Sequence, residues 1–100
     1  MLKNVYNMTT SGEVICSGPA WYLGFAARTN ATSRAYFFAY DNPTTAAGLK
    51  VEDWELDGGK EVDFHEHIHE VYCVSGLYAT CSGLTKDYPS VYYRRNPLQG

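Results

Sequence analysis

The sequence has little positive charge and no long apolar run. It contains 8 Lys and Arg against 11 Asp and Glu, so the 100 residues carry a formal net charge of −3 at pH 7. Nucleic-acid-binding proteins usually show clustered positive charge, whereas the only adjacent basic pair here is Arg94-Arg95. No segment is apolar over the roughly 20 residues of a membrane-spanning helix, and residues 1–13 lack the apolar stretch of a signal peptide. We therefore expect a soluble protein, made in a cytoplasm, that binds neither nucleic acid nor membrane.

Cysteine is scarce and irregularly spaced. The three residues are Cys16, Cys73 and Cys81, and no two of them form a CxxC pair. This spacing excludes the usual zinc-ribbon and thioredoxin-like motifs. A reducing cytosol favours buried thiols that pack as small apolar side chains. A bond between Cys73 and Cys81 across neighbouring strands is the alternative.

Common catalytic and cofactor-binding motifs are absent too. The sequence contains no GxSxG, no P-loop and no glycine-rich dinucleotide fingerprint. Four carboxylates lie close together, at Glu52, Asp53, Glu55 and Asp57. Acidic residues grouped in a strand and turn are more often a solvated surface than an acid–base pair. The sequence therefore predicts a protein that is not an enzyme and holds no cofactor.

What the sequence does contain is a series of short β-type segments separated by turn residues. The predicted strands are 12–16, 21–28, 35–40, 49–56, 61–68, 71–74, 77–81 and 90–94. About eight strands at spacings near ten residues predict an all-β fold, a single antiparallel β-sandwich of jelly-roll type. The expected domain covers residues 12–95, with an extended arm at 1–11 and a tail at 96–100. Residues 43–48 are the one predicted place for a helical turn.

Aromatic residues are too numerous for a thin core. There are 15, of which nine are Tyr, and Tyr on a surface usually marks a contact with a partner. In the strand 35–40 the aromatic residues Tyr36, Phe38 and Tyr40 should share one face. A second set, Trp21, Tyr22, Trp54, Tyr92 and Tyr93, would form either a sugar-binding platform or core and subunit contacts.

Several segments resemble, in order, parts of small structural proteins of tailed bacteriophages. Residues 40–48 read Tyr-Asp-Asn-Pro-Thr-Thr-Ala-Ala-Gly and are similar to a turn in that family with the pattern YDN-x-T-x-A-x-G. Residues 21–25, 71–80 and 89–94 are similar to the family's strands before and after this turn. The resemblance covers roughly residues 12–94.

This resemblance implies a role in the virion. It suggests a compact β-sandwich that associates, commonly as a homotrimer, and acts as a capsid decoration or cement protein. Such a subunit would bind the major capsid protein at the capsid surface and stabilise the head, because many weak copies on a symmetric lattice bind firmly. A tail or head-fibre domain that binds host glycans is the alternative.

The turn motif also has a physical interpretation. Its predicted structural residues are Asp41, Asn42, Gly48, Gly76, Leu77 and Tyr78. Asp41 and Asn42 are expected to cap the strand and turn the chain out of the sheet. Gly48, and likewise Gly76, is expected to adopt a backbone conformation that a β-carbon would forbid. The strand after Gly76 should send its first two residues to opposite faces.

All three histidines, His65, His67 and His69, lie in one short segment. His65, Glu66 and His69 spell HExxH, which binds zinc on a helix because positions i and i+4 share a face there. A small zinc hydrolase is thus an alternative from another class, and it requires a helix over residues 61–74. The Gly-Gly turn before the segment and its β-branched and aromatic flanks predict a strand instead.

On a strand, the three histidines would lie on one face, about 7 Å apart. Val62, Phe64 and Ile68 would occupy the opposite face. Trimeric phage fibres use such strands to bind a metal on the threefold axis, so the resemblance suggests His65, His67 and His69 as ligands shared by three copies. The simpler interpretation is a wet polar face whose protonation would make assembly sensitive to pH below about 6.

Overall fold

The structure is a computed structural model that describes residues 4–29, 34–56, 62–83 and 89–95. These residues form eight strands and no helix, which confirms the all-β prediction. The strands are β1 (Asn4–Asn7), β2 (Gly12–Cys16), β3 (Ala20–Thr29), β4 (Ala35–Tyr40), β5 (Lys50–Leu56), β6 (Val62–Cys73), β7 (Leu77–Ser82) and β8 (Ser90–Arg95).

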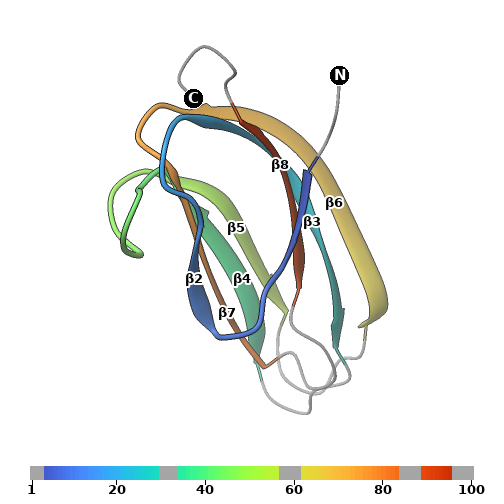
Figure 1. Cartoon of the computed structure of the whole chain (residues 1–100). Helices are drawn as coiled ribbons and strands as arrows, with labels where there is room; N and C mark the ends of the chain where they lie inside the picture. The colour runs from blue at the N-terminus through green and yellow to red at the C-terminus, as the bar shows by residue number, and fades with distance from the viewer. Residues whose placement is uncertain (1–3, 30–33, 57–61, 84–88, 96–100) are drawn as a thin grey trace.

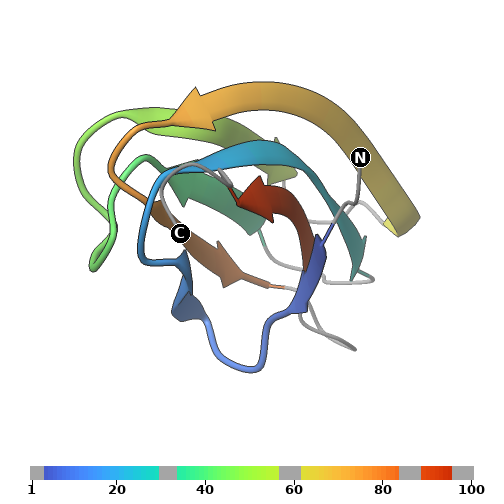
Figure 2. The same cartoon turned by 45° about the horizontal axis from the view of Figure 1, so that its top comes forward.

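The strands are arranged in two antiparallel sheets that face each other, one on each side of Figure 1. Their orders are β1-β8-β3-β6 and β2-β7-β4-β5. The pairs β4–β5, β3–β6, β2–β7 and β1–β8 are nested, as in one long hairpin wound across both sheets. This winding is that of a jelly roll. Figure 2 shows the long, curved β6 at the margin of its sheet.

The core lies between the sheets and is built by strand alternation. In β4, Ala35, Phe37 and Ala39 are fully buried, whereas the residues between them are half-buried on the outside. Phe37 stacks on Phe25 of β3, with ring centroids 4.2 Å apart, and so joins the two sheets. Leu77 and Ala79 of β7 are also fully buried. The predicted alternation of both strands is confirmed.

Three predictions about elements were wrong. The arm predicted at residues 1–11 contains β1, which pairs with β8, and Met8 after it is buried in the core. The segments 61–68 and 71–74 are one strand, β6, because β3 pairs along nearly all of it. Residues 43–48 contain bends and no helical turn. The Gly-Gly turn predicted before the histidine segment and the tail predicted at 96–100 lie outside the described residues.

The cysteines are confirmed as buried, free thiols. Cys73 lies in β6 and Cys81 in β7, which belong to different sheets, so the alternative bond between neighbouring strands does not form. Burial is the main cause that raises the pKa of Cys73 to about 12 and that of Cys81 to about 11. Both thiols are therefore protonated and unreactive at neutral pH.

Candidate functional site

Asp41 closes the predicted turn motif by binding a distant turn. Its carboxylate accepts hydrogen bonds from the backbone N–H groups of Val74 (3.1 Å), Ser75 (2.9 Å) and Gly76 (3.3 Å). Its own N–H donates to the carbonyl of Leu49 at 2.8 Å. Asp41 thus holds the loop 41–49 and ties it to the turn between β6 and β7.

Asn42 orders the inside of the same loop. Its side-chain oxygen accepts hydrogen bonds from the N–H groups of Thr44 (2.9 Å) and Thr45 (3.0 Å), and its amide donates to the carbonyl of Ala47 at 3.2 Å. Gly48 follows with φ of +85°, in the left-handed region that favours glycine. The turning role predicted for Asn42 and the backbone conformation predicted for Gly48 are confirmed.

Gly76 is required for a different reason from the one predicted. Positive φ values occur at Gly24, Gly48 and Gly83, not at Gly76, so the predicted conformation was wrong. A β-carbon at Gly76 would instead lie 2.7 Å from the Cα of Pro43, too close for any real contact. The loop 41–49 therefore packs directly against the backbone of the β6–β7 turn.

An aromatic surface covers the outside of the β2-β7-β4-β5 sheet. Tyr36, Phe38 and Tyr40 of β4 share it with Tyr78 of β7, because Tyr40 lies opposite Tyr78 in the register and opposite residues share a face. All four are half-buried. We call these four residues the aromatic face. Gly12 of β2 extends it, since its backbone lies under the Tyr78 hydroxyl.

Three rings and two cations lie next to one another along this face. The rings of Tyr36 and Phe38 are stacked with centroids 4.5 Å apart and an interplanar angle of 15°. The Lys50 ammonium lies 3.9 Å from the Phe38 centroid and 5.8 Å from that of Tyr40. The Arg34 guanidinium lies 6.0 Å from the Tyr36 centroid at the other end. The rings of Tyr36 and Phe38 therefore each contact the other ring and one cation.

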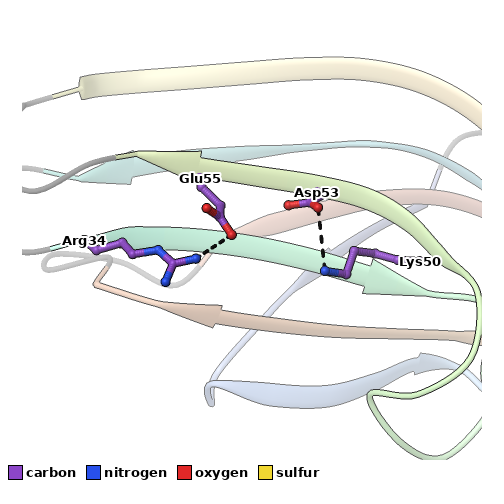
Figure 3. A network of polar contacts seen from close by, with 4 residues as sticks. All are labelled: Arg34, Lys50, Asp53 and Glu55. Carbon is purple, nitrogen blue, oxygen red and sulfur yellow. Dashed lines mark hydrogen bonds and ion pairs between the residues drawn. The ribbon is translucent and has the colours of Figure 1, made fainter.

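Two ion pairs fix the cations of the stack (Figure 3). Arg34 binds Glu55, and the Lys50 ammonium lies 3.6 Å from the Asp53 carboxylate. The Glu55 and Asp53 side chains are 43% and 58% exposed, which agrees with the predicted solvated surface. The border of the aromatic face therefore carries balanced charge.

Glu52 does not fit the predicted solvated surface. It is only 6% exposed, and its carboxylate accepts a hydrogen bond of 2.8 Å from the Tyr22 hydroxyl. Burial is the main cause that raises the pKa of Tyr22, and the nearby Glu52 charge adds to it. This pair links β3 of one sheet to β5 of the other. Asp57, the fourth carboxylate of the group, lies outside the described residues.

The second set of aromatic residues does not form one platform. Tyr22 is fully buried, and Trp54 and Tyr93 pack against the core. Trp21 lies on the outside of the other sheet, where its ring contacts Tyr72 at 5.1 Å between centroids. The sugar-binding platform predicted from these residues is therefore not assembled.

The histidines lie on a strand, not on a helix. Residues 62–73 form β6, so the helix that an HExxH zinc site requires is not present. The register places His65 opposite Ala27 and His67 opposite Phe25. The side chains of the three histidines lie outside the described part of the structure. Ile68, which was predicted to share an apolar face with Val62 and Phe64, is 61% exposed.

The described side chains contain no group of three or more His, Cys, Asp or Glu residues that could hold a metal ion. In the same part of the chain, no helix has the length and apolar character needed to cross a membrane. The fold and the aromatic face thus define a jelly-roll β-sandwich with an ordered outer surface. Comparisons with protein-family models, curated proteins and solved structures found no match.

Proposed function

We propose that this chain is a structural subunit that binds another protein through its aromatic face and performs no catalysis. The observation that carries the proposal is the stack of Arg34, Tyr36, Phe38, Lys50 and Tyr40 on the outside of the sheet. Tyr and Arg are over-represented among residues that dominate protein interfaces. Rings already held in place lose little conformational entropy on binding.

The specific form that we propose is a capsid decoration subunit of a bacterial virus, bound to the major capsid protein. The resemblance at residues 40–48, 71–80 and 89–94 supports this form, and a jelly-roll sandwich suits it. A lattice of identical sites strengthens each weak contact through multivalency. We keep the capsid-surface location as part of this proposal, whereas the homotrimer remains only what the resemblance implies.

A protein partner fits the aromatic face better than a glycan does. Sugars bind aromatic platforms through the flat faces of the rings. Here the facing sides of Tyr36 and Phe38 cover each other, and Lys50 lies over Phe38. At Tyr36 and Phe38 the surface therefore offers ring edges, which pack well into the side chains of a partner protein.

Imaging of the source virus tests the viral form of the proposal. Particles purified from an infected culture would be reconstructed by cryo-electron microscopy, and the chain would be identified in them by mass spectrometry. We expect density for the sandwich at threefold or quasi-threefold positions of the capsid. Particles that lack the chain, or that carry it on the tail, would overturn the capsid assignment.

A binding experiment tests the surface itself. The full chain, added to capsid shells stripped of it, should sediment with them, and the double substitution Tyr36→Ser with Phe38→Ser should weaken binding at least about tenfold. Ile68→Ser is the matched control, because Ile68 is exposed on the opposite sheet. Circular dichroism would confirm that both variants fold. Equal binding of the double variant and the control would exclude the aromatic face.

A further inference from the structure

One end of the sandwich is apolar and exposed. It is formed by the loop 41–49, which projects in green at the left of Figure 1, and by the adjoining turn 74–76. We call these residues the apolar tip. It contains Leu49 and Val74, which at 67% and 63% are the most exposed large hydrophobic residues in the described part of the chain.

Leu49 and Val74 lie close together although they are far apart in the sequence. The Leu49 carbonyl accepts a hydrogen bond from the Asp41 N–H, and the Val74 N–H donates to the Asp41 carboxylate. The backbones of both residues are therefore bonded to the same residue, Asp41. Residues 44–49 are exposed without interruption. The tip is thus one surface and not two separate apolar residues.

The tip carries almost no charge. Residues 42–49 and 74–76 include no Asp, Glu, Lys, Arg or His. The one charged group, the Asp41 carboxylate, already accepts three backbone hydrogen bonds. This is unusual in a chain in which 19% of the residues are charged.

The tip is also ordered in advance of any contact. Asn42 binds the N–H groups of Thr44 and Thr45, and Gly76 packs against the backbone of Pro43. A loop held in this way loses little conformational entropy when it binds. Exposed apolar groups on a fixed loop are a feature of contact surfaces.

We propose that the apolar tip is the contact through which two copies of this chain associate. Each copy has a net charge of −3, so copies repel each other, and an uncharged surface allows them to approach with least repulsion. In a twofold contact the same patch meets itself, and an uncharged apolar patch is complementary to itself. The tip has no aromatic ring for stacking on a sugar and no cation for a nucleic acid or an anionic membrane.

This contact goes beyond the proposed function and does not depend on it. The tip lies at one end of the sandwich, whereas the aromatic face covers the outside of a sheet, so a pair joined at the tips keeps both aromatic faces available. Such a pair would engage a lattice at two points, which strengthens binding without any new contact.

Sedimentation equilibrium of the full chain tests the proposal. From about 10 μM to about 1 mM, we expect the average mass to rise from the monomer value of 11.2 kDa toward twice that value. Leu49→Ser and Val74→Ser should each weaken association about tenfold, because each removes a buried apolar side chain from the contact. Raising the salt concentration should not weaken it, since no ion pair is formed.

Two control variants test whether any loss of association is specific to the apolar tip. Ile68→Ser and Val5→Ser change side chains that are 61% and 51% exposed but lie away from the tip, and they should associate like the wild type. A chain that stays monomeric at about 1 mM, or tip variants that associate like the controls, would overturn the proposal. If Phe38→Ser abolished association and Leu49→Ser did not, self-association would belong to the aromatic face. Capsid binding is measured in a separate experiment, so the proposal for the aromatic face and the proposal for the apolar tip can each fail independently of the other.

Discussion

Two carboxylates hold turns of this sandwich by the same chemistry, but they differ in how much structure depends on them. Glu13 accepts hydrogen bonds from the N–H groups of Thr9 and Thr10 and from the Tyr6 hydroxyl, all within seven residues. Asp41 binds N–H groups that lie 33 to 35 residues away. Glu13 thus orders a local corner, whereas Asp41 joins separate parts of the fold.

The sequence separation of these hydrogen bonds determines how much of the fold depends on each carboxylate. A local corner can loosen while the sheets remain paired, because the chain near it is short. A long-range contact holds together segments whose separation costs the entropy of a long loop. We therefore expect changes near Asp41 to lower the stability of the entire sandwich more than changes near Glu13.

The largest effect is expected at the glycines of the two regions. Gly76→Ala places a β-carbon 2.7 Å from the Cα of Pro43, and backbone atoms cannot move away easily. We expect the free energy of unfolding to fall by about 3 kcal/mol, measured by urea denaturation. Gly12→Ala is the matched control, because its β-carbon would meet only the movable hydroxyl end of Tyr78, at 2.9 Å. Equal losses for the two variants would contradict the comparison.

A smaller effect is expected when the carboxylates themselves are removed. Asp41→Ala leaves three N–H groups without their acceptor, and we expect a loss of about 2 kcal/mol. Asp41→Asn should lose less, because one side-chain oxygen remains. Glu13→Ala should lose about 1 kcal/mol. Thermal unfolding followed by circular dichroism would rank the three variants, and a larger loss for Glu13→Ala than for Asp41→Ala would refute the comparison.

The smallest effect is a dependence on pH at the Glu13 corner. Burial alone raises the pKa of Glu13, but hydrogen bonds from Thr9, Thr10 and Tyr6 together bring the pKa below its ordinary value. A carboxyl group with a lower pKa in the folded state than in the unfolded state stabilises the fold when it is ionised. This stabilisation is complete at pH values above the pKa of the unfolded state, and it is lost as the pH falls through the pKa of the folded state. The stability difference between wild type and Glu13→Gln should therefore shrink from about pH 6 to about pH 3.

Urea unfolding at several pH values would measure this difference directly. Glu55→Gln is a useful control, because Glu55 is an exposed carboxylate that binds the Arg34 side chain. A wild-type advantage that stays constant over the whole pH range would show that the ionised form of Glu13 does not hold the corner.

Much of the fold was predictable because alternation and turn residues agree locally. The bounds of β2 and β4 match the prediction, since turn-forming residues flank both alternating segments. β1 was missed because its polar sequence shows no alternation, and its partner β8 lies at the other end of the chain. Its formation depends on a sheet edge that no local pattern reveals.

The candidate site was predictable only in part, for a similar reason. The capping role of Asp41 follows from its position after a strand, but its partners in the β6–β7 turn are more than 30 residues away and carry no local signal. The burial of Glu52 could have been predicted from the alternation of residues along its strand. Glu52 alternates with Trp54 on the inner side of β5, opposite Ala39 in the register. Acidic neighbours concealed that pattern.

The nested strand order has one more consequence. Every connection between consecutive strands, except that from β4 to β5, leads from one sheet to the other. Separating the two layers would therefore have to displace most of the connections of the fold at once, so we expect the sandwich to open only as a whole.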